Sequence, residues 1–136
     1  MSSKLQFLNK LKDNPNDVGA LEEMGDFAAV NGRTDLAIEA FTEALRIKPI
    51  CNKILLKRGK TYVKQGMLNY ALSDFSQSIL HEPHSAVPYM LRGTLFGRIG
   101  NLDRAVLDFS QAIVLRPELA DAYYNRGLVY QKKYQI

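Results

Sequence analysis

A repeat of 34 residues is the feature that most constrains how this chain can fold. The same residue types return at this interval from one end of the chain to the other. The recurring residues are Gly25, Gly59, Gly93 and Gly127; Gly32, Gly66 and Gly100; Ala37, Ala71 and Ala105; Phe7, Phe41, Phe75 and Phe109; and Pro15, Pro49, Pro83 and Pro117. A fixed period of this length indicates stacked copies of one supersecondary unit, none of which buries its apolar face alone.

Each copy has the pattern of two helices joined by a tight turn. Within residues 86–119, Tyr89 and Gly93 lie on one face of a first helix, and Ala105 and Phe109 lie on one face of a second. The glycine between the helices suits the left-handed conformation that ends many helices. The small residues let two helix backbones approach closely, and the phenylalanine fills the space between neighbouring helices. The pattern therefore predicts an all-α fold of antiparallel helix pairs.

The period divides the chain into five segments. They are an N-terminal capping helix or degenerate half repeat over residues 1–17, full repeats over 18–51, 52–85 and 86–119, and the first helix of a truncated repeat over 120–136. In the first segment, Leu5, Leu8 and Leu11 predict a short amphipathic helix over Lys4–Asn14. Because the last segment stops where a second helix is due, we expect a fragment or truncated form of a longer array.

The third repeat shows most clearly which known family the chain is similar to. It carries Tyr89, Arg92-Gly93, Phe96, Ala105, Phe109, Ala112 and Pro117. This pattern resembles the tetratricopeptide repeat (TPR) family, in which an aromatic residue or Leu, then Leu-Gly, Tyr, Ala, Phe, Ala and Pro follow in order. The resemblance implies a solenoid that is a right-handed superhelix, with first helices lining a concave groove that binds other proteins. Three arginines in place of the family's Leu, and Ser78 in place of Ala, are departures.

Arginine and aspartate occur together in some repeats and are absent together in another. Arg58 occurs with Asp74, and Arg92 occurs with Asp108. The same positions of the first repeat carry Met24 and Ala40. We predict ion pairs between these residues, either within a repeat or across the boundary as Asp74–Arg92 and Asp108–Arg126. The alternative is that the association arose by chance.

A row of lysines occupies the expected groove face of the second repeat. Its members are Lys53, Lys57, Lys60 and Lys64. Like charges at this helical spacing repel each other. Three interpretations remain open: a basic strip that binds an acidic peptide, ion pairing with Glu23 and Asp26 of the neighbouring first helix, or a plain solvated face.

The same face of the later repeats is mostly apolar or aromatic. The candidate residues there are Val87, Met90, Leu91, Thr94, Arg98, Tyr124 and Asn125. Apolar side chains on an exposed groove often mark a contact site, although these could instead pack against the next repeat. Together with the lysines, they predict a groove for a peptide segment that combines acidic and apolar residues.

Some TPR proteins hold a C-terminal carboxylate through a clamp of Lys, Asn and Arg on successive first helices. The matching positions of this chain carry Glu22, Asp26, Lys57, Val87 and Leu91. The sequence therefore disfavours that clamp. We also expect self-association through the edge of the last helix, where Tyr123, Val129 and Tyr130 would have one uncovered side.

Other functional classes find little support. The net charge of +4 permits an acidic partner, but aromatic residues do not interleave with the lysines as nucleic-acid binding would require. No catalytic motif is present, and His81, Glu82 and His84 are too few and too constrained by Pro83 for a metal site. We therefore expect no enzyme activity, no cofactor and no metal.

Cysteine content and hydropathy bear on location. The single Cys51 cannot form an internal disulfide, and no apolar run approaches the length of a membrane span. The sequence thus predicts a cytoplasmic protein in a reducing compartment, without membrane attachment.

Overall fold

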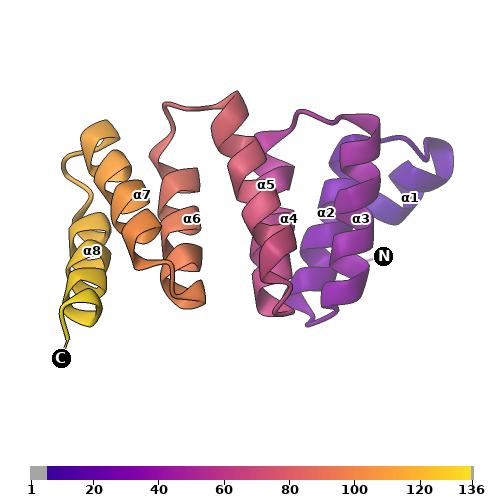
Figure 1. The fold of residues 1–136 in the computed structure, drawn as a ribbon. Helices are drawn as coiled ribbons and strands as arrows, with labels where there is room; N and C mark the ends of the chain where they lie inside the picture. The colour runs from indigo at the N-terminus through magenta and orange to yellow at the C-terminus, as the bar shows by residue number, and fades with distance from the viewer. Residues whose placement is uncertain (1–5, 136) are drawn as a thin grey trace. The chain divides into compact units, whose positions relative to one another are not determined.

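The structure, a computed structural model, describes residues 6–135, and the regular secondary structure in this range is all α-helix. The helices are α1 (Gln6–Asp13), α2 (Val18–Val30), α3 (Thr34–Ile47), α4 (Asn52–Lys64), α5 (Leu68–His81), α6 (Ala86–Ile99), α7 (Leu102–Leu115) and α8 (Ala120–Lys133). Figure 1 shows consecutive helices running in opposite directions from α2 to α4 and from α6 to α8. The all-α fold predicted from the period is confirmed.

The chain forms two compact units that divide between Asp74 and Phe75, inside α5. In the first unit, α2 packs against both α1 and α3, and α3 packs against α4. In the second unit, α7 packs against both α6 and α8, and α6 also touches α8 (Figure 1). In the first unit the first helix α2 therefore lies between α1 and α3, and in the second unit the second helix α7 lies between the first helices α6 and α8.

Glycines end the first helix of each pair. Gly32, Gly66 and Gly100 have φ angles of 75°, 77° and 98°, in the left-handed region that side chains with a Cβ rarely adopt. After α2, the N–H of Arg33 donates to the carbonyl oxygen of Ala28 at 2.8 Å. This bond satisfies a carbonyl at the end of the helix and fixes the turn into α3. The left-handed turns predicted from the glycines are confirmed.

A phenylalanine lies against a glycine in the core of each unit. In the first unit Phe41 is 1% exposed, and its ring covers Gly25 so closely that a Cβ there would lie 2.7 Å from Cδ1. In the second unit, a Cβ on Gly93 would lie 2.9 Å from Cε1 of Phe109. Contacts shorter than 3.0 Å to a Cβ do not occur without a shift of the neighbouring atoms. The recurring glycine therefore creates the space that the recurring phenylalanine fills.

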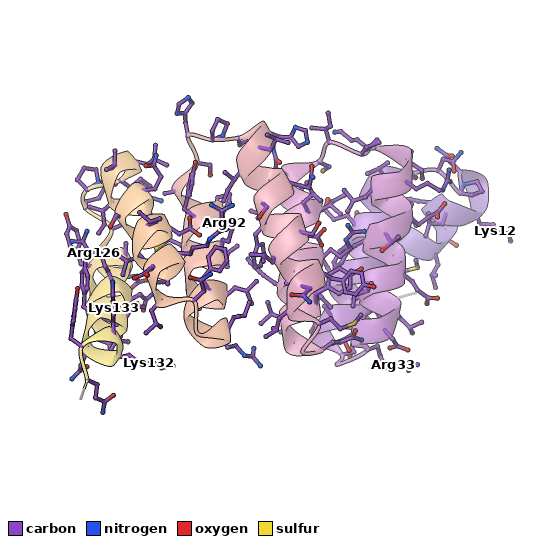
Figure 2. All side chains as sticks on the ribbon, viewed as in Figure 1. Lys12, Arg33, Arg92, Arg126, Lys132 and Lys133 are labelled. Atoms are coloured by element: carbon purple, nitrogen blue, oxygen red, sulfur yellow. The ribbon has the colours of Figure 1, made fainter. Side chains whose placement is uncertain are left out.

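Two arginine–aspartate pairs join the first and second helices of a repeat. Arg58 donates from Nε and Nη2 to Asp74 at 2.9 and 2.7 Å, and Arg92 donates to Asp108 at 2.8 and 2.9 Å. Both aspartates are buried. Figure 2 labels Arg92, which extends from α6 toward α7. Of the two predicted arrangements, pairing within a repeat is the one found, since Arg126 donates to Ser110 at 3.1 Å instead of to Asp108.

The short helix α1 covers one side of the first unit. Phe7 is 3% exposed, and its ring centroid lies 5.8 Å from that of Phe27 on α2. The predicted helix began at Lys4, but Lys4 and Leu5 lie outside the described residues. Between residues 6 and 135, no helix has both the length and the apolar character that crossing a membrane requires.

Candidate functional site

The lysine row lies on α4, opposite two carboxylates of α2. Glu22 and Asp26 are four residues apart, so both point from the same face of α2. Nζ of Lys57 lies 2.6 Å from Oε2 of Glu22 and 2.9 Å from Oδ2 of Asp26. Nζ of Lys53 lies 3.3 Å from Oε1 of Glu22. The N-terminal half of the row is therefore tied to the preceding first helix.

Burial and neighbouring charges shift the pKa values of this network in opposite directions. Partial burial raises the pKa of Glu22, but hydrogen bonds and positive charge from Lys57 and Lys53 outweigh it, so the pKa lies below its usual value. Burial likewise lowers the pKa of Lys57, and the two carboxylates raise it by more, for a net increase. Lys57 therefore stays charged at neutral pH, and its charge is already shared by two acidic groups.

The C-terminal half of the row lines a small concave pocket. This pocket, of about 180 Å³, is bounded by Asp26 and Ala29 of α2, Phe41 of α3 and the α4 residues Lys57, Lys60, Thr61 and Lys64. Lys60 and Lys64 are exposed, and neither forms an ion pair with another residue in the 6–135 range. Two ammonium groups beside this hollow can receive carboxylate groups, with Lys57 adding a fixed positive charge.

The pairing differs in one residue from the prediction. Asp26 binds the row as expected, but Glu23 is turned away, and its Oε1 lies 3.3 Å from Nζ of Lys10 on α1. Glu22 takes the place expected for Glu23. Glu22 and Glu23 precede Asp26 by four and three residues, so helical spacing allows either to share its face, and the packing of α2 against α4 selects Glu22.

The apolar candidates belong to the second unit and lie on α6. Val87 is 45% exposed, whereas Met90 and Leu91 are half-buried. Met90 packs against the core cluster formed by Ala86, Ala112 and Ala122. This contact agrees with the alternative interpretation, in which Met90 packs against the next repeat. Thr94 is exposed and donates from Oγ1 to the carbonyl oxygen of Met90 at 2.9 Å. Arg98 is exposed in the last turn of α6.

Two further candidates lie on α8. Tyr124 is 68% exposed, and Asn125 is half-buried. The structure thus gathers the lysines in the first unit and the residues from Val87 to Asn125 in the second. Each unit therefore presents its own candidate surface.

The residues considered for a metal site lie around the turn after α5. Between residues 6 and 135, no group of three or more His, Cys, Asp or Glu side chains is placed to hold a metal ion. His81, Glu82, Pro83 and His84 line an open hollow at the turn after α5. Cys51 precedes α4 and is half-buried.

Comparison with known proteins identifies relatives of this fold. A model described as "Tetratricopeptide repeat" matches residues 6–49, and one described as "TPR repeat" matches residues 93–133. No curated protein sequence gives a significant match to the chain.

Three solved structures are similar at 21–22% identity, a level that speaks to the fold alone. A structure of MamA has a TM-score of 0.89 and 22% identity, over 96% of this chain and 76% of that one. The first TPR of Spaghetti (RPAP3), bound to the HSP90 peptide SRMEEVD, has a TM-score of 0.80 and 21% identity, over 85% and 92%. YrrB, described as a TPR protein with an unusual peptide-binding site, has a TM-score of 0.82 and 22% identity, over 96% and 67%.

Proposed function

Because the chain belongs to the tetratricopeptide repeat family, we propose that it is a non-catalytic interaction scaffold whose first helices bind a peptide with acidic and apolar residues. The fold is an all-α TPR solenoid, the same fold as two proteins that are described as bound to a peptide or as having a peptide-binding site. The peptide in one of them, SRMEEVD, itself combines acidic residues with Met and Val.

One observation supports the acidic part of the ligand most strongly. Lys60 and Lys64 line a concave pocket, and no carboxylate among residues 6–135 forms an ion pair with either. By contrast, Lys57 is held by two carboxylates, which fix its position. A peptide carboxylate that reaches Lys60 and Lys64 therefore displaces only water. Exposed ion pairs of this kind are individually weak, so several acidic residues are needed.

The second unit presents a surface of its own for apolar side chains. Val87 and Tyr124 are the most exposed apolar and aromatic members of the candidate set there. Tyrosine provides a large contact area at a low cost in conformational entropy, which makes it a good anchor. This surface suits apolar side chains of a peptide segment.

Charge reversal of Lys60 and Lys64 tests the proposal. We expect the variant Lys60→Glu, Lys64→Glu to bind fluorescein-labelled acidic-apolar peptides, SRMEEVD among them, at least about tenfold more weakly than the unchanged protein. The reason is that two attractive charges become repulsive. Fluorescence anisotropy titrations at low and high salt measure the change, and the salt dependence should shrink in the variant.

A variant with the same change of net charge provides the control. Lys12 lies on α1 and Lys48 lies at the end of α3, both outside the lysine row. The variant Lys12→Glu, Lys48→Glu should keep the affinity of the unchanged protein. Equal losses in both variants would show that net charge and not the pocket governs binding. Equal binding of SRMEEVD and a lysine-substituted peptide would show that the site does not recognise acidic residues.

We propose self-association as a second function, on the basis of α8. Tyr123, Gly127 and Tyr130 are spaced at i, i+4 and i+7, and both tyrosines are exposed. A Cβ on Gly127 would meet nothing within 4 Å, whereas Gly25 and Gly93 at the same repeat position are covered by phenylalanines. The face that receives an aromatic side chain elsewhere is therefore uncovered on α8, and a second copy of the chain could cover it.

The mass of the protein in solution tests this second proposal. We expect the average mass in sedimentation equilibrium to rise with concentration toward that of a dimer. The substitution Tyr130→Lys should keep the protein monomeric, because it places a charge in the apolar contact. Val114, which is 72% exposed on α7, provides the control, since Val114→Lys should not alter the association. A constant monomer mass over the whole concentration range would refute self-association.

A further inference from the structure

The largest cavity described lies in the first unit, away from the lysine row. Its volume is about 540 Å³, and it opens between α1, α2 and α3. Its walls are mainly apolar and include Phe7, Leu8, Met24, Phe27, Leu36 and Ala40. Leu8 is 50% exposed, Leu36 41% and Phe27 36%. A pocket of this size and character is typical of a ligand site, and nothing in the proposed function uses it.

The repeat period explains why the pocket is apolar. Two periods, or 68 residues, further along the chain, Met24, Leu36 and Ala40 correspond to Arg92, Arg104 and Asp108. Those three charged residues line a smaller hollow of about 250 Å³ at the same place on the α6–α7 pair. The first helix pair therefore lacks the ion pair that fills this face in the α6–α7 pair, and it has an apolar cavity there instead.

The next helix pair shows what this face normally receives. Arg58, one period after Met24, donates from Nη1 to Oγ1 of Thr42 at 3.2 Å, so the second helix α3 lies against this face of α4. On the α2–α3 pair, the corresponding place is taken by α1. The described part of that helix, Gln6–Asp13, has 8 residues, whereas α3 has 14. The pocket is thus the part of a helix-docking face that residues 6–13 do not cover.

The rim of the pocket is acidic along α3. Glu39 and Glu43 both line it and lie one helical turn apart. Oε1 of Glu43 is 2.6 Å from Nη2 of Arg46, and within residues 6–135 Glu39 forms no ion pair. One cation, Arg33, lies at the turn before α3 (Figure 2). A ligand that fills the apolar walls therefore meets carboxylates along α3, which favour a basic side chain.

We propose that the pocket between α1, α2 and α3 binds an amphipathic helix of a partner protein, with apolar side chains inside and a lysine or arginine over Glu39 and Glu43. The apolar residues of that helix are spaced at i, i+3 and i+4 or i+7, so that they enter the pocket from one face. The basic residue lies one turn from these anchors. The site is separate from the lysine row, which favours ligands of opposite charge.

A designed peptide probe tests the proposal on the full chain. The probe is a fluorescein-labelled helical peptide as long as α3, with leucines on one face and lysines on the other. We expect it to bind at least about tenfold more tightly than the same peptide with the leucines changed to serine or the lysines to glutamate. Fluorescence anisotropy measures the affinities, and reversal of Lys60 and Lys64 should leave them unchanged.

The chain itself suggests a variant that closes the pocket. Met24→Arg with Ala40→Asp introduces the ion pair that the α4–α5 and α6–α7 pairs contain, and it should fold as they do. We expect this variant to keep its circular dichroism spectrum and to lose probe binding by at least about tenfold. Glu39→Lys should weaken binding of the lysine probe and strengthen binding of its glutamate version.

Three outcomes would overturn the proposal. They are failure of the full chain to bind the leucine–lysine probe, equal binding by the pocket-closing variant, and equal binding of the serine-substituted probe. Should the pocket-closing variant misfold, Leu36→Lys tests the same point. Leu36 is exposed, so the new lysine would place a charge in the pocket without disturbing the core, and probe binding should be lost.

Discussion

Replacement of Asp108 by alanine is expected to lower the free energy of unfolding by about 3 kcal/mol. Asp108 is 5% exposed and accepts two hydrogen bonds from the guanidinium of Arg92. Without it, the Arg92 side chain, which is 23% exposed, would retain its charge with little solvent to stabilise it. Arg92 remains partly exposed and also donates a hydrogen bond to Ser76, so we expect a loss at the lower end of the range for a broken buried ion pair. Urea denaturation followed by circular dichroism measures it.

The double variant Arg92→Met, Asp108→Ala separates the loss of an ion pair from the isolation of a charge. It copies Met24 and Ala40, which stand at the same repeat positions in the first helix pair. Replacing both partners by apolar groups of similar size is often nearly neutral. We therefore expect the double variant to recover to within about 1 kcal/mol of the unchanged protein. A double variant as unstable as Asp108→Ala would contradict this explanation.

Gly25→Ala is expected to destabilise the protein by about 2 kcal/mol, since overpacking a core typically costs 1–3 kcal/mol. The new Cβ would lie 2.7 Å from Cδ1 of Phe41 and closer still to Cε1. The Phe41 ring is 1% exposed and cannot move aside without displacing its neighbours. The loss arises although alanine favours helix more than glycine does. The midpoint of thermal or urea unfolding reports it.

Gly127→Ala is the matched control, because it makes the same chemical change at the same repeat position. At Gly127 a Cβ would meet nothing within 4 Å, and the residue is exposed on α8. Only the helix preference of alanine then remains, which is worth about 0.5–1 kcal/mol in favour of folding. We expect opposite signs for the two variants, measured at low protein concentration. Destabilisation by both would mean that packing against Phe41 is not the cause.

The repeated residues made most of the fold predictable. Gly32, Gly66 and Gly100 each form a left-handed turn, and Gly25 and Gly93 each make room for a phenylalanine ring. Such roles recur with the period, so comparing one repeat with the next reveals them. The helices, the turns and the TPR family followed from this pattern.

The non-repeated residues were harder to interpret. The lysine row was visible in the sequence, but whether its charges meet a ligand, a carboxylate or water depends on side chains from another helix. The structure divides the row, with Lys57 bound to Glu22 and Asp26 and with Lys60 and Lys64 without such partners among residues 6–135. Helical periodicity places Glu22 and Glu23 only 100° apart, and tertiary packing selects between them.

The apolar pocket of the first unit was not predicted, although its signal was present. Met24 and Ala40 were recognised as the positions where the arginine–aspartate pair is missing, but the absence of an ion pair does not by itself reveal a cavity. The cavity also depends on how α1 packs on α2, with Phe7 against Phe27, which is a property of the packed helices.

The sequence by itself determined the repeat, the helix pairs and the residues that pack at each position, because these follow from local periodicity and side-chain size. It also showed which charged residues occur together. Only the tertiary structure decided that Arg58 and Arg92 pair within their own repeats. It alone decided which lysines have carboxylate partners and where an apolar face is uncovered. These features depend on distances between helices, which no periodicity along one chain encodes.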